Sequence, residues 1–275
     1  MIKTLCICLL LLMSGSAADG PADLLVDLAP GLRIQTIEPG VYLVVHRFPG
    51  ACNSLLVECG PQQFVWADTP LTNEATQQVH QWLNNTFNDP NLIQINTGFH
   101  NDNLAGNAYL IEQGIPCYGA DLTVKLLAEQ WPKTAKIVEP YYKRSGKQYH
   151  DALLHNLMVP PNRLYPINEG LTLNVGNETL EVFFPGASHA LDNVVVYFPS
   201  RQLLYGGCMI KAANARSPGF TADADMTAWP QSLQKVKERF PKTRLVVPGH
   251  GLCGDLMLLR HTIELCDTYN RETQQ

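Results

Sequence analysis

The sequence is poor in charged residues and contains no basic cluster. Of its 275 residues, 16% are Asp, Glu, Lys or Arg, and the formal net charge is −5. This excludes a dedicated nucleic-acid surface, because such surfaces need clustered positive charge. Hydrophobic residues make up 45% of the chain. That balance is the reverse of the one typical of disorder, so we expect most of the chain to fold.

Long hydrophobic runs are also missing. Beyond the N-terminus, no apolar stretch approaches the roughly 20 residues that a membrane-spanning helix needs. At the N-terminus, Lys3 precedes an apolar run over residues 5–13, and small residues follow at 14–18. This layout is typical of a secretory signal peptide. We therefore predict that residues 1–18 are removed, and that residues 19–275 form one exported, periplasmic protein with no membrane partner.

Cysteine is sparse for an exported protein. Outside the predicted signal peptide there are six cysteines: Cys52, Cys59, Cys117, Cys208, Cys253 and Cys266. An oxidising compartment permits disulfides, but a chain of this length buries enough surface to fold without them. Cys52 and Cys59 flank a strand-like run and are interpreted as small buried apolar residues. The sequence leaves the disulfide state of these two, and of Cys117, Cys253 and Cys266, open.

The sequence has no internal repeat, but strands and helices alternate in two successive halves that join near Pro160-Pro161. In the first half, periodicity and turn residues predict strands at 34–37, 41–46, 54–58, 64–67 and 92–95, and helices at 72–87, 104–113, 122–131 and, more weakly, 141–156. In the second half they predict strands at 171–175, 179–184, 194–198, 203–205 and 244–247, and helices at 226–240 and 256–269. Two sheets with helices outside predict an α/β fold, a four-layer αββα sandwich. Two separate domains are the alternative.

Four predicted strands each run into a potential metal ligand beside a glycine. The residues are His100 and Asp102, His189, Cys208, and His250. Strand ends are where sheet proteins assemble their sites. Imidazole, thiolate and carboxylate form the ligand set that zinc takes, so the repeated context predicts a metal site. The other histidines lack this context, and His46 is interpreted as a strand-surface residue.

The segments that carry these ligands resemble those of a known family. They are residues 66–70 (WADTP), 97–102 (TGFHND), 185–193 (PGASHALDN), 206–211 (GGCMIK) and 247–251 (VPGHG). In order and spacing they resemble the zinc-dependent metallo-β-lactamases, closest to subclass B1, over nearly the whole mature chain. The resemblance implies an αββα fold with the site at the edge between its sheets. It also implies hydrolysis of the β-lactam amide bond, and hence antibiotic resistance, with a small-molecule substrate. We expect a monomer.

The resemblance further implies two zinc ions, with one departure in this sequence. A first zinc would be held by the two histidines of a His-x-His-x-Asp pattern and by His189, and a second by Asp102, Cys208 and His250. Here His100 is the second histidine of the pattern, and Gly98 replaces the first. Glycine has no side chain to bind a metal, so the first site is incomplete.

Three completions of the first site are open. Water completes a two-histidine zinc, an amide of Asn96 or Asn101 reaches in, or the site stays empty and one zinc remains. Subclass B2 also lacks a histidine at this position and looks like a mono-zinc carbapenem hydrolase. We expect two zinc ions with the first weakly held, and one zinc ion as the alternative.

The resemblance assigns roles to further residues. Zinc lowers the pKa of bound water to about 7 and so supplies hydroxide as the nucleophile, which Asp102 would orient. Lys211 would pair with the substrate carboxylate. Asp68 would orient the ligands through hydrogen bonds, although capping of the following helix is an alternative. Phe220 stands where many B1 members have an asparagine that contacts the substrate carbonyl, so we expect carbapenems to be favoured over bulky β-lactams.

Two other functions remain open at this point. Thioesterases and glyoxalases of the same fold usually carry His-x-His-x-Asp-His, whereas Asn103 follows Asp102 here. A catalytically decayed, exported zinc-binding protein is conceivable because of Gly98 and Phe220. Retention of Lys211 and of a complete Asp-Cys-His set argues against decay. The sequence contains no convincing Ser-x-x-Lys motif that would supply a serine nucleophile instead.

Overall fold

The computed structural model describes residues 24–273. The predicted signal peptide at residues 1–18 lies outside this range. Within the range, none of the helices has the length and apolar character needed to cross a membrane.

The first sheet has eight strands in the order of the sequence, β1 to β8. They are β1 (Leu25–Ala29), β2 (Leu32–Glu38), β3 (Val41–Arg47), β4 (Ala51–Gly60), β5 (Gln63–Ala67), β6 (Asn91–Ile95), β7 (Cys117–Ala120) and β8 (Arg163–Tyr165). Strands β1 to β5 pair antiparallel, whereas β5 to β8 pair parallel. The parallel pairs need crossover connections, which the helices supply.

The second sheet has five strands in the order β13-β12-β11-β10-β9. They are β9 (Leu171–Val175), β10 (Glu178–Phe183), β11 (Val195–Phe198), β12 (Leu203–Gly207) and β13 (Leu245–Pro248). Strand β13 pairs parallel to β12, and the other pairs are antiparallel. The chain passes from one sheet to the other between β8 and β9, a few residues beyond the predicted junction at Pro160-Pro161.

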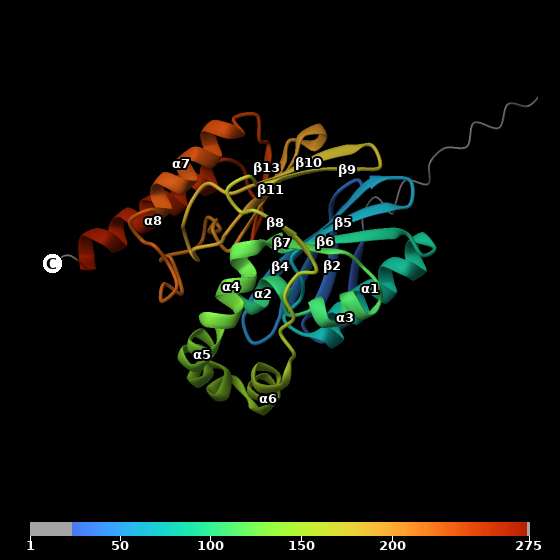
Figure 1. The fold of residues 1–275 in the computed structure, drawn as a ribbon, viewed down its shortest axis with the longest axis horizontal. Coiled ribbons are helices and arrows are strands. Elements are labelled where there is room, and N and C mark those ends of the chain that lie inside the picture. Colours follow the sequence, from blue (N-terminus) through green and yellow to red (C-terminus); the bar gives the residue numbers. More distant parts are fainter. Residues whose placement is uncertain (1–23, 274–275) are drawn as a thin grey trace, which may run out of the picture.

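Helices cover the outer face of each sheet, which gives four layers (Figure 1). The helices are α1 (Asn73–Phe87), α2 (Asn101–Leu104), α3 (Asn107–Glu112), α4 (Asp121–Glu129), α5 (Trp131–Ser145), α6 (Lys147–His155), α7 (Trp229–Arg239) and α8 (Met257–Thr273), with a short 3-10 helix at Pro199–Arg201. Helices α1 and α3 pack on the first sheet through one apolar cluster, and α7 and α8 pack on the second sheet through another. A third cluster fills the space between the sheets. The predicted αββα sandwich is therefore confirmed.

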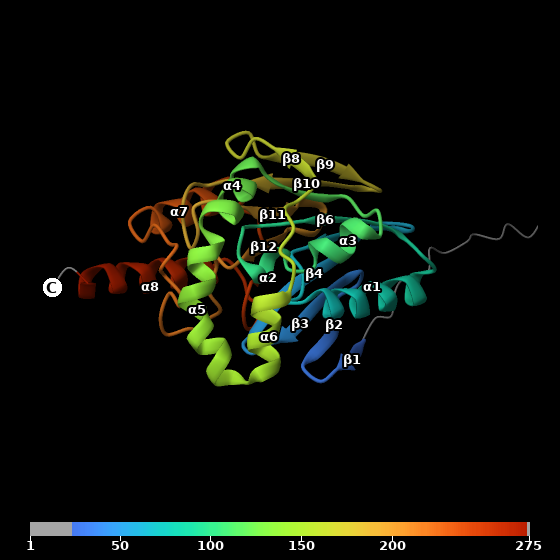
Figure 2. The same cartoon turned by 60° about the horizontal axis from the view of Figure 1, so that its bottom comes forward.

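The region from 121 to 155 differs most from the prediction. A helix was expected to end at 131 and a weaker one to start at 141, but the chain forms three helices in succession, α4, α5 and α6. Pro132 lies in the first turn of α5, where its missing N–H costs nothing. Gly146, with φ of +141°, separates α5 from α6. Figures 1 and 2 show α5 and α6 side by side, away from the helices that cover the two sheets.

Two local expectations about the first half can be checked. Thr72 caps α1 as predicted, since its side chain accepts a hydrogen bond from Ala75 N at 3.1 Å. The interpretation of His46 as a surface residue was wrong, because its side chain is buried. Alternation along β3 turns His46 inward, and its Nδ1 accepts a hydrogen bond from Leu71 N at 3.0 Å. The periodicity of a strand does not tell which of its faces loops and helices will cover.

Burial of His46 predicts acid sensitivity. Burial lowers its pKa from 6.5 to about 4, so between these values the unfolded chain binds a proton that the folded protein does not. We expect His46 to leave the free energy of unfolding unchanged above pH 6.5 and to lower it by about 3 kcal/mol as the pH falls to 4. Urea unfolding of His46→Gln, which keeps an acceptor, should show a smaller loss over that range. His155→Gln, at an exposed position, is the control and should behave like the unsubstituted protein.

Candidate metal centre

The predicted ligands meet at one end of the two sheets. His100 and Asp102 follow β6, His189 follows β10, Cys208 follows β12 and His250 follows β13. The parallel pairing of β12 with β13, in which Gly207 faces Pro248, brings the last two ligands together. This approach requires glycine at position 249, because a β-carbon there would lie 2.8 Å from Cys208 N.

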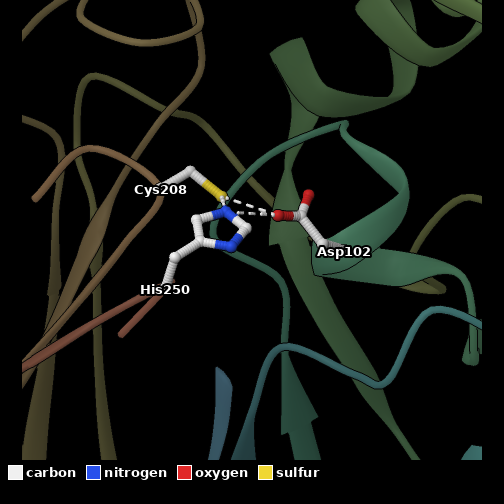
Figure 3. A group of neighbouring side chains, drawn as sticks. All are labelled: Asp102, Cys208 and His250. Carbon is white, nitrogen blue, oxygen red and sulfur yellow. Dashed lines mark hydrogen bonds and ion pairs between the residues drawn. The ribbon is translucent and has the colours of Figure 1, made fainter. Parts of the chain in front are cut away.

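Asp102, Cys208 and His250 form a compact cluster, here called the thiolate site (Figure 3). Cys208 Sγ lies 3.0 Å from Asp102 Oδ2 and 3.6 Å from His250 Nε2. His250 Nε2 lies 3.1 Å from the same carboxylate oxygen. Tetrahedral zinc with bonds of about 2.0–2.3 Å separates its ligand atoms by roughly 3.3–3.7 Å. The three side chains therefore fit a zinc ion with only small adjustments.

His250 is oriented for this role by its other ring nitrogen. Nδ1 lies 2.7 Å from the carbonyl oxygen of Ala51. A carbonyl only accepts, so Nδ1 donates to Ala51 O and Nε2 is the ring nitrogen that faces the cluster. The His250 side chain is 46% exposed, which leaves the thiolate site open to solvent on this side.

The electrostatics of the thiolate site favour a cation. Burial opposes ionisation of Asp102, but the hydrogen bond and charge of His250 hold the pKa of Asp102 well below its usual range. Burial, reinforced by the charge of Asp102, raises the pKa of the Cys208 thiol. A metal cation that binds here must therefore displace the Cys208 proton, so binding should release acid and weaken at low pH.

His100 and His189 form a second group, here called the histidine pair. Their ring centroids lie 5.1 Å apart with the rings almost perpendicular. His100 Nε2 lies 3.0 Å from Asp223 Oδ2, so Nδ1 of His100 is the nitrogen left for a metal. Within residues 24–273, the thiolate site is the one group of three or more candidate ligands whose atoms lie within 4.8 Å of one another. The histidine pair thus offers two ligands and lacks a third.

Gly98 is closely surrounded where a first histidine would begin. A β-carbon at position 98 would lie 2.5 Å from Asn193 Nδ2. Asn193 is held in place at both ends of its amide, since Nδ2 donates to Thr97 O at 3.2 Å and Oδ1 accepts from Ala190 N at 2.8 Å. A side chain at 98 therefore requires Asn193 to give up hydrogen bonds that connect the two loops of the histidine pair.

Both candidate amides have hydrogen-bond partners of their own. Both ends of the Asn96 amide are bonded to Asn107, and its Nδ2 also donates to Asn103 O. Nδ2 of Asn101 donates to Tyr142 Oη at 2.9 Å. An Asn96 ligand, one of the completions left open by the sequence, would have to give up these hydrogen bonds.

We expect Gly98→Ala to lower the free energy of unfolding of the metal-free protein by about 1–3 kcal/mol, the usual cost of overpacking a buried position. Urea unfolding measures it. Gly50→Ala is the matched control, since a β-carbon there meets only Tyr141 Oη at 3.5 Å. Equal free energies of unfolding for the two variants would contradict this prediction and show that Asn193 can move aside without loss of stability.

Asp68 lies at the centre of a buried network next to the thiolate site. Its carboxylate accepts from Thr97 N and Oγ1, from Tyr205 Oη and from Asn103 Nδ2, all at 2.7–2.9 Å. Asn103 Nδ2 also lies 3.8 Å from Cys208 Sγ. Burial raises the pKa of Asp68 to about 7 despite these donors. Asp68 does not cap α1, since Thr72 does so.

Lys211 is a buried cation without a carboxylate partner. Its side chain lies over the ring of Trp229, with Nζ 5.2 Å from the centroid, and within residues 24–273 it forms no ion pair. Burial lowers the pKa of Lys211, and the neighbouring Cys208 and Asp102 counteract this. A buried, unpaired ammonium group is unfavourable, so a bound anion would be stabilised here.

Asp102, His250, the histidine pair and Lys211 line one cavity of about 440 Å³. One wall is apolar and comes from α5, with Trp131, Ile137, Val138, Tyr141 and Tyr142. Phe48 also lines the cavity, and Phe220 contacts both rings of the histidine pair, with centroid distances of 5.8 Å to His100 and 6.4 Å to His189. Sequence reasoning missed the α5 wall and Asp223. The apolar spacing of residues 131–142 was a usable signal for the wall, whereas Asp223 lies in a loop without a pattern.

All six cysteines of the described residues are free thiols. Cys52 and Cys59 are buried, as expected of small apolar residues. Cys208 is the one that lies in the thiolate site.

Comparison with known proteins gives a consistent picture. No family profile matches the chain. It is 31% identical over 208 residues to a metallo-beta-lactamase type 2 of Bacteroides fragilis, covering 76% of this chain and 72% of the relative. It is 33% identical over 198 residues to the protein of that name from Bacillus cereus, covering 72% and 65%. The solved structure of a metallo-beta-lactamase from Pontibacter korlensis superposes with a TM-score of 0.71 at 30% identity, covering 86% of this chain and 99% of that one.

Proposed function

The chain belongs to the metallo-β-lactamase family, and from this premise we propose that it is a zinc-dependent β-lactamase that hydrolyses the amide bond of the β-lactam ring. One observation carries the proposal. Two residues of a complete Asp-Cys-His ligand set, Asp102 and His250, line the same cavity as the unpaired cation Lys211. A β-lactam presents a carbonyl for attack and, in most classes, a carboxylate nearby, which matches this combination.

Asp102, Cys208 and His250 would hold the zinc ion. Zinc bound there supplies a Lewis acid, which activates water as hydroxide and stabilises negative charge on the departing nitrogen. Asp102 has a second carboxylate oxygen, which can accept a hydrogen bond from the attacking water and fix its direction. Ala51 O keeps the imidazole of His250 turned toward the site, and Asn103 links the thiolate to the Asp68 network.

Lys211 would bind the substrate carboxylate. Its backbone N–H donates to Thr262 Oγ1 at 2.9 Å, which fixes the start of its side chain on α8. The ammonium group lies over Trp229, so its movement is restricted and little entropy remains to be lost on binding. A carboxylate held there would place the ring carbonyl inside the cavity between Lys211 and the ligands.

We also propose two zinc ions, with the histidine pair binding more weakly than the thiolate site. The support is that the ring centroids of His100 and His189 lie 5.1 Å apart, while among residues 24–273 the pair belongs to no cluster of three candidate ligands. Water would have to complete the coordination. A stoichiometry of one zinc ion at saturating metal would contradict this part of the proposal and leave the thiolate site standing.

The cavity favours compact substrates. Phe220 fills the end beside the histidine pair and cannot donate a hydrogen bond to the substrate carbonyl, and α5 closes one side. We therefore propose that carbapenems, whose side chain on the ring is small, are preferred over penicillins with bulky acylamino groups.

Replacement of Phe220 should shift this preference. We expect Phe220→Asn to raise kcat/KM for a bulky penicillin by about 10-fold relative to a carbapenem. The smaller side chain adds space, and its amide can donate a hydrogen bond to the oxygen of the substrate carbonyl. Phe220→Ala, which adds space alone, separates the two causes. Equal kcat/KM of the unsubstituted protein for both substrates would contradict the proposed preference.

The function itself is tested with the purified protein and a carbapenem. Loss of ring absorbance should require zinc, stop with a chelator and return when zinc is added back. No hydrolysis against a positive control would instead favour another zinc hydrolase of this fold. Metal binding without hydrolysis of β-lactams, thioesters or glyoxalase substrates would favour a zinc-binding protein that has lost catalysis.

A further inference from the structure

Helix α5 is attached to the ligand segment 100–102 by side-chain hydrogen bonds. The attachments lie on the side of α5 that faces the cavity, and Figure 2 shows this helix running past α2, which begins at Asn101. One attachment runs through Asp223 to His100, and the other joins Tyr142 to Asn101. Together they connect the apolar wall of the cavity to the candidate ligand His100 and to its neighbour Asn101.

Asp223 is the centre of the first attachment. Its Oδ2 accepts from Thr134 Oγ1 at 2.7 Å and lies 3.0 Å from His100 Nε2, and its Oδ1 accepts from Gln130 Nε2 at 2.8 Å. The Asp223 side chain is 2% exposed. A carboxylate this deeply buried depends on all three donors. Two of them lie at the start of α5, since Gln130 immediately precedes this helix and Thr134 lies in its first turn, and the third is a member of the histidine pair.

The second attachment prevents α5 from rotating about the first. Tyr142 lies two helical turns beyond Thr134, and its hydroxyl accepts from Asn101 Nδ2 at 2.9 Å. Tyr142 is buried, so this bond is shielded from water. Between the two attachments lie Ile137, Val138 and Tyr141, the wall residues that a substrate would touch. The wall and His100 are therefore parts of one hydrogen-bonded unit.

We propose that Asp223 is a positioning residue that couples the placement of α5 to the orientation of His100, so that the substrate wall and metal binding at the histidine pair depend on each other. This inference rests on the proposed function. His100 needs its Nε2–H held by Asp223 to present Nδ1, and Asp223 is held by α5. Because such coupling is reciprocal, a ligand that packs against α5 should tighten the histidine pair by the same factor as metal there tightens the ligand.

The inference predicts a selective change in metal affinity. Thr134→Val removes one donor to Asp223 and keeps the shape of the side chain, and Asp223→Ala removes the acceptor for His100. We expect the affinity of the histidine pair for Zn²⁺ to fall about 10-fold in Thr134→Val and by more in Asp223→Ala. The affinity of the thiolate site should stay unchanged. Gln130→Met, at a half-buried position, is a second test should either variant fold poorly.

The experiment uses Co²⁺ and Zn²⁺ titrations of the full mature protein. The charge-transfer absorption band between the Cys208 thiolate and Co²⁺ reports metal bound at the thiolate site. The remaining metal uptake reports metal bound at the histidine pair. Thermal unfolding of the metal-free variants monitors the fold. Thr76→Val is the matched control, because it also removes a buried threonine hydroxyl, one that bonds only to Thr72 O within the start of α1.

The outcomes are distinguishable. Equal weakening of both sites, or no weakening of either, would overturn the coupling, and so would a parent protein that binds no cation at the histidine pair. These results leave the thiolate site, and with it the proposed function, intact. Absence of the thiolate absorption in the parent protein would instead contradict the proposed function.

Discussion

Cys208→Ser is expected to lower kcat/KM for a carbapenem by about 1,000-fold or more. Loss of a metal-bound thiolate removes several kcal/mol of transition-state stabilisation, and each 1.4 kcal/mol is a factor of ten. Serine is similar in size but is a poor zinc ligand at neutral pH, since its hydroxyl does not ionise readily. In this chain the effect is large because Cys208 is one of only three ligands of the complete site.

Two measurements separate this loss from a folding defect. Thermal unfolding of the metal-free variant should match the unsubstituted protein within a few degrees, because a serine hydroxyl can donate to Asp102 and accept from Asn103 as the thiol does. Cys253→Ser is the matched control, since Cys253 lies beyond β13, outside the thiolate site, and packs on the apolar cluster between the sheets. It should retain activity. A Cys208→Ser protein within ten-fold of full activity would show that catalysis does not depend on the thiolate site.

Lys211→Ala is expected to raise KM by about 10- to 100-fold with a smaller change in kcat. A hydrogen bond to a charged group contributes about 1.5–3 kcal/mol, and Lys211 is buried and forms no ion pair with any of residues 24–273. The interaction exists in the bound substrate as well as in the transition state, so its loss should appear mainly in KM. Steady-state kinetics with a carbapenem measure both parameters.

The control for Lys211 is Lys237→Ala on α7, which removes an exposed lysine and should leave both parameters unchanged. A further check uses a substrate analogue in which the carboxylate is esterified. The unsubstituted protein should bind the ester about as weakly as Lys211→Ala binds the acid. Similar KM values for the acid in Lys211→Ala and in the unsubstituted protein would contradict the anchoring role.

The fold, and the clustering of Asp102, Cys208 and His250, could be predicted because local sequence patterns determine them. Each ligand stands beside a glycine at the end of an apolar strand, and strands that end at one edge of a sheet bring such residues together. Gly249 illustrates this, since its lack of a side chain lets the His250 loop approach Cys208. The capping of α1 by Thr72 is equally local, because it depends on a side chain three residues from its partner.

What escaped the sequence depends on contacts between distant residues. Asp223 acts through His100, which is 123 positions away, and no spacing rule relates them. Strands β7 and β8 are short and acquire their pairing from neighbours in the sheet rather than from their own pattern. The burial of the His46 side chain depends on which residues pack over that face of β3. Helix α4 was expected, but the first part of α5 escaped, because Pro132 and Pro140 interrupt the pattern of a continuous helix.

The central claim is that the thiolate site is the catalytic metal centre of a β-lactamase. The most direct measurement titrates metal-free protein with zinc and follows carbapenem hydrolysis and proton release in the same samples. The structure predicts that activity appears with the first equivalent, accompanied by release of the Cys208 proton, and that the second equivalent binds more weakly. Hydrolysis that is absent at every zinc concentration, or that persists in the metal-free protein, would contradict the claim.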